Sequence, residues 1–298
     1  VSYLWGGGIR QVFHRRIGSQ DRVWTAEDGG RIRYSTDGGS HWSFASTPDD
    51  SSPTPPAKDG ASQGILDVYF MPEGPDEDIG WACGLGGRVL KSIDGGATWD
   101  HANPLDPVVE TNVGQEPATL WRVRFLNEQL GIVAGLWTLR FTVDGGLTWD
   151  IIPELSELKD PDNPGSRYFP QQFEFYSLEL LGTPAGFVGN LGGQFWLGGK
   201  GGTAKQGFVF HTDSTDPDSE GGRRWWVTFD ELQQPTGCSI TVNPPIQDPW
   251  DIEFEDPSDT DPHGHRGYLV GGLGHLEGGI YTTTDSGETW STPGIRRG

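Results

Sequence analysis

The stretch Ser92-Ile93-Asp94-Gly95-Gly96-Ala97-Thr98-Trp99 decides the fold, because the same pattern returns along the chain. Three other copies are intact, and a fifth is split by an insertion after its aspartate. The aspartates and tryptophans of the five boxes are, in pairs, Asp37 and Trp42, Asp94 and Trp99, Asp144 and Trp149, Asp213 and Trp225, and Asp285 and Trp290.

Each box has the chemistry of a tight hairpin turn. Asp-Gly supplies the positive φ that such a turn requires, and the aspartate accepts hydrogen bonds from main-chain N–H groups one to three residues ahead. The tryptophan then begins the next strand and offers a large apolar surface for packing. We therefore predict structural roles, not catalytic ones, for the box residues.

Further strand-like segments precede every box. In the second unit they span 66–70, 80–84 and 88–92, and in the third unit 121–125, 131–135 and 139–142. The fourth unit reads 176–180, 186–189 and 207–210, the fifth 250–254, 268–272 and 279–282, and the first, more loosely, 11–14, 23–26 and 31–34. Each unit is thus predicted to be four strands in a meander, with the box between strands three and four.

The spacing of the boxes predicts a closed ring. The box aspartates are separated by 57, 50, 69 and 72 residues, and the distance around the chain ends is 50. We predict an all-β fold, a single β-propeller domain spanning 1–298, built of four-stranded antiparallel blades. Five blades are favoured over six. No window shows the 3.6-residue periodicity of a helix.

Composition and charge narrow the classes of function. The 298 residues include 46 Gly and 22 Pro, yet also 13 Trp, 14 Phe and 7 Tyr, so the chain has enough apolar surface to fold. The net charge of −21 argues against nucleic acid as a partner, because phosphate binding depends on clustered Lys and Arg. No apolar run is long enough to span a membrane.

The box motifs of this chain resemble those of a known group of proteins. The Ser/Thr-x-Asp-Gly-Gly-x-Thr-Trp pattern is similar to the Asp-box, or BNR, repeat of bacterial sialidases, xyloglucanases and sortilin-like receptors. The longer form at 81–99 is more similar to the photosystem II assembly/stability factor-like propellers. The resemblance implies a propeller fold for nearly the whole chain. It leaves the function open, since these relatives include enzymes and pure binding proteins.

In a propeller the first strand of each blade lines the central channel. The polar residues of these strands are therefore the candidates for binding or catalysis. We predict a protein partner whose acidic segment is held by Arg122 and Arg124, with Tyr69 beside them and Trp196 as a further docking surface. A second mode that the sequence leaves open is a basic partner that meets the acidic loops. The alternative is a carbohydrate-active enzyme or lectin that uses the channel carboxylates Asp67, Glu179, Asp251 and Glu253.

The leading interpretation is a non-enzymatic assembly, stability or accessory subunit of a larger complex, with membrane-associated complexes among the candidates. Carbohydrate is the alternative ligand. No cofactor is expected, and the weak metal candidates are His263 and His265 in a Pro/Asp-rich loop. The chain begins at Val1 without an initiator Met, which is typical of a processed exported protein or a shortened chain. We predict a periplasmic or extracellular location.

Overall fold

The computed structural model describes residues 8–48, 64–71, 75–105, 108–112, 116–151, 159–160, 163–167, 174–181, 194–201, 206–213, 224–229, 241–243, 248–254, 266–272, 278–284 and 289–291. The chain divides into two compact units, Val1–Ile152 and Pro153–Gly298, which are described separately below. The single domain spanning 1–298 stays a prediction. Among the described residues, no helix is long and apolar enough to cross a membrane.

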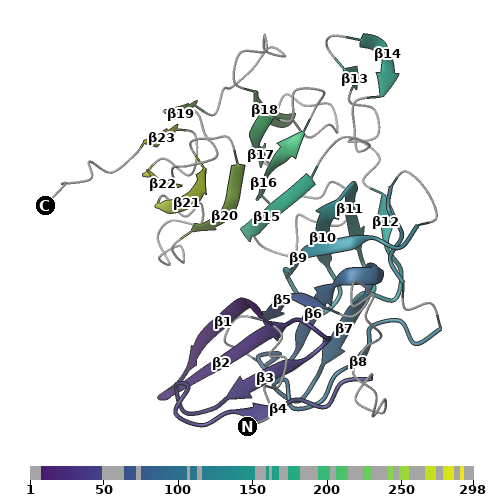
Figure 1. Cartoon of the computed structure of the whole chain (residues 1–298), viewed down its shortest axis with the longest axis vertical. Helices are drawn as coiled ribbons and strands as arrows, with labels where there is room; N and C mark the ends of the chain where they lie inside the picture. Colours follow the sequence, from purple (N-terminus) through teal and green to yellow (C-terminus); the bar gives the residue numbers. More distant parts are fainter. Residues whose placement is uncertain are drawn as a thin grey trace, which may run out of the picture. The chain divides into compact units, whose positions relative to one another are not determined.

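The first unit contains three sets of four antiparallel strands, each connected in chain order (Figure 1). A single 3-10 turn, Leu85–Gly87, interrupts the strands described here. The strands are β1 (Ile9–Ile17), β2 (Gln20–Glu27), β3 (Ile32–Ser35), β4 (Ser43–Phe44), β5 (Ile65–Phe70), β6 (Gly80–Gly84), β7 (Val89–Ser92), β8 (Asp100–His101), β9 (Thr119–Phe125), β10 (Gly131–Leu136), β11 (Thr138–Thr142) and β12 (Asp150–Ile151).

The second unit contains two further sets, β15–β18 and β20–β23. The strand β19 adds to the last set by parallel pairing with β23, and β13 and β14 form a separate hairpin. The strands are β13 (Lys159–Asp160), β14 (Asn163–Arg167), β15 (Glu174–Leu181), β16 (Gln194–Gly201), β17 (Gln206–Asp213), β18 (Arg224–Phe229), β19 (Thr241–Asn243), β20 (Asp248–Phe254), β21 (Gly267–Gly272), β22 (Gly278–Thr283) and β23 (Thr289–Ser291).

The predicted class is confirmed, and the predicted blade number is wrong. The fold is an all-β propeller built of four-stranded antiparallel sets, but hydrogen bonding groups the five sets of described strands into four sheets of four or more strands, because two of the sets share one sheet. The boxes show how many times the motif recurs along the chain. It does not specify which strand edges pair by hydrogen bonds, and that pairing sets the number of sheets.

In the three boxes of the first unit, a network of short hydrogen bonds closes the turn. Asp94 accepts from the backbone N–H of Thr98 at 2.9 Å and from the Thr98 hydroxyl at 2.7 Å. The Ser92 hydroxyl donates to Asp94 at 2.9 Å and accepts from the Gly96 N–H, also at 2.9 Å. The backbone N–H of Thr98 lies four residues ahead of Asp94, one beyond the predicted range, and a further backbone hydrogen bond from Ala97, three residues ahead, lies within it. Asp37 and Asp144 make the same backbone bond to His41 and Thr148.

These hydrogen bonds favour the charged aspartates. Burial opposes the charge of Asp94, but the hydrogen bonds from Thr98 and Ser92 outweigh it and lower the pKa of this carboxyl. The balance at Asp144 is the same, with Thr148 and Thr142 as donors that lower its pKa. Both glycines of each of these boxes have positive φ, between 69° and 97°, a region that side chains disfavour.

A tryptophan on the second strand of one set clamps the next set within the first unit. Trp81 stacks on Phe125 with ring centroids 3.6 Å apart and an interplanar angle of 7°, and its indole N–H donates to the Gly145 carbonyl at 3.1 Å. Phe125 in turn covers Gly131, where a Cβ atom would lie 2.6 Å from the ring. The box turn, the strands and the aromatic pair are therefore one packed unit.

The same clamp recurs elsewhere. Trp24 stacks on Phe70 at 4.1 Å and donates to the Gly95 carbonyl at 2.9 Å. In the second unit, Trp196 lies against Phe254 at 4.4 Å. All three indoles are at most 1% exposed. Stacked aromatic pairs add to the free energy gained by burial, so this repeat is a main source of cohesion between sets.

The box tryptophans do not share one environment. Trp99 and Trp290 are buried and Trp149 is half-buried, but Trp42 is 42% exposed. Trp99 and Trp149 make edge contacts with Phe70 and Phe125. The strand register puts His14, which is exposed, at the position that Phe70 and Phe125 occupy. Trp42 therefore lacks that aromatic partner and buries less of its surface than Trp99. The side chains of Asp213, Trp225 and Asp285 lie outside the described residues.

The second strand of the fourth predicted unit was misplaced. The expected segment 186–189 lies outside the described residues, and the strand that pairs with β15 is β16, Gln194–Gly201. Three glycines suggest a loop in this segment by propensity. Backbone pairing on both sides, to β15 and β17, outweighs that propensity.

Removal of one clamp tests its contribution to stability. We expect Trp81→Ala to lower the free energy of unfolding by about 3–5 kcal/mol, because a large buried aromatic side chain and its hydrogen bond are lost. Urea unfolding of the full chain measures this. Trp42→Ala, which removes an exposed indole, is the matched control. Equal losses in the two variants would contradict the clamp.

Acid titration tests the box network. Since the folded pKa values of Asp94 and Asp144 lie below the unfolded value of about 3.9, their charges stabilise the fold above that pH. This stabilisation is lost as the pH falls through the folded pKa values. We expect Asp94→Asn to make the loss of unfolding free energy below pH ~4 shallower, as measured by urea titrations at several pH values. The exposed Asp100→Asn is the control, and an unchanged slope for Asp94→Asn counts against the network.

Candidate functional site

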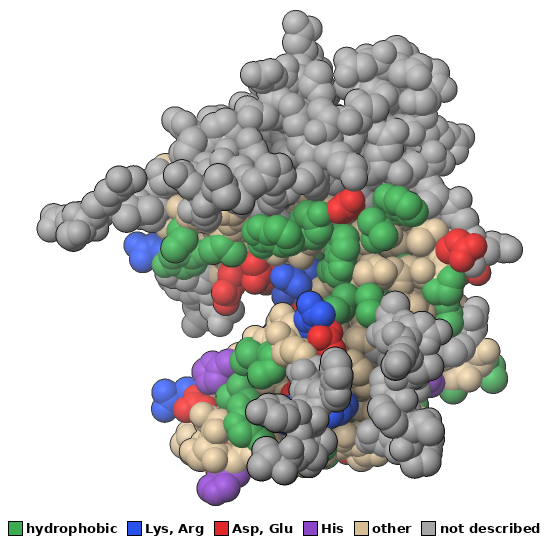
Figure 2. Space-filling view, in the orientation of Figure 1, with side chains coloured by type: hydrophobic (Ala, Val, Ile, Leu, Met, Phe, Trp, Pro, Cys, Tyr) green, Lys and Arg blue, Asp and Glu red, His purple; other side chains and the backbone are tan. Residues whose placement is uncertain are grey.

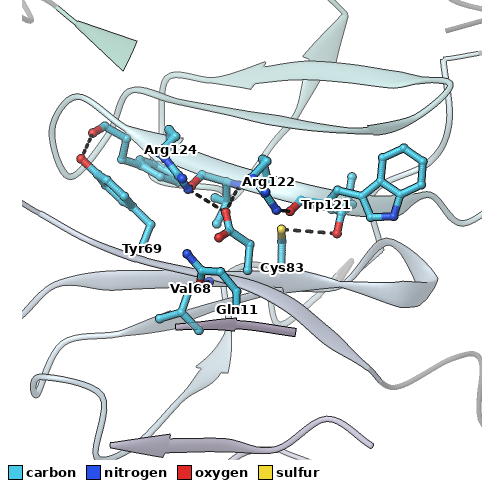
Figure 3. Close-up of polar contacts among 11 residues, drawn as sticks. Gln11, Val68, Tyr69, Cys83, Trp121, Arg122 and Arg124 are labelled. Carbon is cyan, nitrogen blue, oxygen red and sulfur yellow. Dashed lines mark hydrogen bonds and ion pairs between the residues drawn. The ribbon is translucent and has the colours of Figure 1, made fainter. Parts of the chain in front are cut away.

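The first strand of each set, here called the inner strand, carries the polar residues singled out from the sequence. In the first unit, β5 lies in contact with both β1 and β9. Val68 and Val123 point into the buried core, and Asp67, Tyr69, Arg122 and Arg124 occupy the alternate positions. Figure 3 shows this cluster, with contributions from all three inner strands.

Hydrogen bonds from backbone N–H groups to side-chain oxygens join the inner strands. The Val68 N–H donates to Gln11 Oε1 at 3.1 Å, and the Val123 N–H donates to Asp67 Oδ2 at 2.8 Å. The register puts Gln11 and Asp67 at the same position of their strands. An acceptor at this position thus satisfies a main-chain donor of the following strand, which would be costly to leave unpaired in the interior.

Asp67 also holds Arg124. Arg124 Nη1 donates to Asp67 Oδ2 at 2.7 Å and to the Val123 carbonyl at 2.8 Å. The Asp67 side chain is fully buried and that of Arg124 is 10% exposed. The guanidinium lies 5.4 Å from the centre of the Tyr69 ring, and the Tyr69 hydroxyl donates to the Phe125 carbonyl at 2.8 Å. The three side chains therefore form one packed, hydrogen-bonded group (Figure 3).

Two other groups complete the cluster. Arg122 is half-buried, and its Nη1 donates to the Trp121 carbonyl at 3.0 Å. Cys83 is buried as a free thiol whose sulfur contacts the Leu120 carbonyl oxygen at 3.6 Å. Burial, with a smaller effect of the Asp67 charge, raises the pKa of this thiol well above its ordinary value. It is therefore a neutral packing group and not a nucleophile.

The four carboxylates proposed for catalysis have different environments. Asp67 is buried and already bonded, whereas Glu179 on β15 is half-buried and Asp251 and Glu253 on β20 are exposed. A general acid or base must reach the reacting group directly or through one water. Asp67 does not meet this requirement in the geometry observed, because its carboxylate is closed off from solvent.

Trp196 does not lie on a surface. It is fully buried in β16 against Phe254, so it is not retained as a partner-binding residue. His263 and His265 lie outside the described residues. Within the described part of the chain, no group of three or more His, Cys, Asp or Glu side chains is arranged to hold a metal ion.

A β-bulge that the sequence pattern does not predict recurs in all five inner strands. At the same point of each strand, one extra residue interrupts the register with the second strand. Bulges redirect side chains and are frequent beside functional sites. Counting apolar and polar alternation gives no sign of an inserted residue, so only the pairing shows it. The extra residues are Arg10, Leu66, Trp121, Tyr176 and Trp250.

The fold and the cluster of polar side chains around Asp67 define the class of this protein as a β-propeller with polar groups on its inner strands. No protein-family model matches the chain. The photosystem II assembly lipoprotein Ycf48 of Synechocystis sp. (strain ATCC 27184 / PCC 6803 / Kazusa) is 34% identical over 119 residues, which are 40% of this chain and 29% of that protein. The resemblance to the assembly-factor propellers is thereby confirmed, over less than a third of the relative's length.

Solved structures agree in fold. The crystal structure of an ancestral GH74 enzyme matches 97% of this chain and 31% of its own, with 15% sequence identity and a TM-score of 0.53. At this identity the likeness concerns the fold alone. A structure of YCF48 bound to a D1 peptide covers 96% of this chain and 81% of its own at 17% identity, with a TM-score of only 0.42, too low to support a conclusion.

Substitution of Asp67 tests its role as a joint between strands. We expect Asp67→Ala to lower the free energy of unfolding by about 3–5 kcal/mol, because it leaves the buried Arg124 charge and the Val123 N–H without this acceptor. Asp67→Asn keeps an acceptor oxygen and should lose less. Chemical unfolding measures both, beside the exposed Asp100→Asn as the control. An Asp67→Ala variant as stable as the parent chain would refute the assignment.

Proposed function

We propose that the protein is a non-enzymatic, protein-binding propeller that acts as an assembly, stability or accessory subunit of a larger complex. The observation that carries this proposal is the state of Asp67. Its carboxylate is buried and bonded to Val123 and Arg124, a structural use that does not suit Asp67 to acid–base chemistry. The match to an assembly lipoprotein supports the same function.

The proposed partner is an acidic segment of another protein that contacts Arg122. Of the two arginines chosen from the sequence, Arg124 is nearly buried by Asp67 and Tyr69, while Arg122 is half-buried. Tyr69 is also half-buried and held by its bond to Phe125, so it offers a fixed aromatic surface. A guanidinium favours carboxylates because its N–H groups form a planar fork. Arg124 is assigned the role of orienting Tyr69.

We also propose that the protein works outside the cytoplasm, in the periplasm or on the exterior of the cell. The support is the matched relative, which is a lipoprotein. A lipid-anchored relative fits the proposal that the complex served by this chain is associated with a membrane.

The alternative, a carbohydrate-active enzyme or lectin, depends on Glu179, Asp251 and Glu253. The GH74 likeness supports it only at the level of the fold. Turnover of xyloglucan or another polysaccharide by the full chain, abolished by Asp251→Asn or Glu253→Gln, would replace the proposal with this one.

Partner capture tests the proposal directly. The tagged full chain is used to isolate proteins from an extract of its source organism, and the bound proteins are identified by mass spectrometry. We expect one specific partner, lost about ten-fold or more in Arg122→Ala and partly kept in Arg122→Lys. Arg16→Ala, which removes an exposed charge from β1, should keep it. If no protein is enriched by the parent chain, the proposed function fails.

A further inference from the structure

The bulges of the second unit leave two aromatic residues that the proposed contact at Arg122 does not use. Tyr176 is the extra residue of β15, between Phe175 and Ser177 in the register with β16. Trp250 is the extra residue of β20, between Pro249 and Asp251 in the register with β21. β15 and β20 contact each other, so the two bulges bring these side chains together.

The two rings form a fixed surface. Their centroids are 4.9 Å apart with an interplanar angle of 33°, and the Tyr176 hydroxyl donates a short hydrogen bond to the Glu174 carboxylate. Tyr and Trp are frequent anchors of binding surfaces, since they offer much contact area at little cost in conformational entropy. We refer to Glu174, Tyr176, Trp250 and Asp251 as the aromatic-acidic patch.

The exposure of Trp250 sets it apart from the tryptophans that pack the sheets. Trp24, Trp81, Trp196 and Trp290 are each at most 1% exposed, whereas Trp250 is 53% exposed. Trp250 stacks on Tyr176 with one face, but about half of its surface is exposed to solvent, so it does not contribute the full free energy of burying an indole. Binding of a partner to this surface would bury the remaining apolar area.

The charge of the second unit indicates the chemistry of that partner. Its described side chains include four carboxylates, those of Glu174, Glu179, Asp251 and Glu253, against the single cation Arg266. In Figure 2, acidic and hydrophobic side chains are visible next to each other on the described surface. An aromatic face combined with carboxylates favours a lysine or arginine side chain, through cation–π attraction and opposite charge.

We propose that the aromatic-acidic patch binds a lysine- or arginine-bearing segment of a partner protein, whose cationic side chain lies against the Trp250 indole. This inference rests on the proposed protein-binding function and adds a second contact of opposite polarity to the one at Arg122. A neutral sugar would also stack on Trp250, but it would gain nothing from the excess of negative charge.

Binding of a defined cationic peptide to the full chain tests the inference. The probe is hexalysine, compared with hexalysine acetylated at every Nζ, by isothermal titration calorimetry at 50 and 150 mM salt. Trp250→Ala changes no charge, so the non-specific attraction of hexalysine to the acidic chain is the same in the variant and the parent chain. Any difference in affinity then reports the contact with the indole. We expect Trp250→Ala to weaken hexalysine binding about five-fold or more, and Trp250→Phe to give an intermediate affinity. Trp42→Ala, an exposed indole of the first unit, should bind like the parent chain.

Three results would overturn the inference. They are equal binding by Trp250→Ala and the parent chain, equal binding of the acetylated peptide, and Trp250-dependent binding of a neutral xyloglucan oligosaccharide without Trp250-dependent binding of hexalysine. Urea unfolding of Trp250→Ala confirms that the variant is folded. Partner capture separates this inference from the proposed function: full capture of a specific partner by Trp250→Ala rejects the patch alone, whereas no capture by the parent chain rejects the function.

Discussion

The packing of one indole between two strand sets is the interaction on which the rest of the structure depends. Trp81 covers Phe125 and donates to the Gly145 carbonyl, so a single side chain fixes an inner strand and a box turn of the next set. Trp24 does the same with Phe70 and Gly95. Four short strands cannot bury both faces alone, and the clamp gives each set a neighbour to pack on.

The polar groups of the inner strands depend on this arrangement. Once the sets are clamped, the Val123 N–H faces Asp67, and the carboxylate that satisfies it also holds Arg124. A residue that looks catalytic in the sequence therefore serves cohesion. Arg122 and Trp250 are less enclosed than Asp67, and they are the residues for which we propose contacts with partners.

The box motif was sufficient to predict the fold class and the places of the three box turns that the structure describes, because Asp-Gly-Gly chemistry is local. It was insufficient for the number of sheets, which depends on pairing between distant edges. The local sequence pattern also did not predict that Trp196 lies in a buried strand, because the segment around it is rich in glycine. It did not predict the exposure of Trp42 either, since that depends on another strand, where His14 occupies the position that phenylalanine has in the next two sets. The bulge that redirects Trp250 adds a residue without changing composition, so no pattern in a single sequence revealed it.

Native-state hydrogen exchange at the Val68 and Val123 amides tests most directly the claim that neighbouring sets are joined through the inner strands. Both amides donate to side chains of the preceding set, at 3.1 and 2.8 Å. The account predicts that they exchange only through global unfolding, with protection equal to that of the central strand β6. Rapid exchange at both amides, while β6 stays protected, would contradict it.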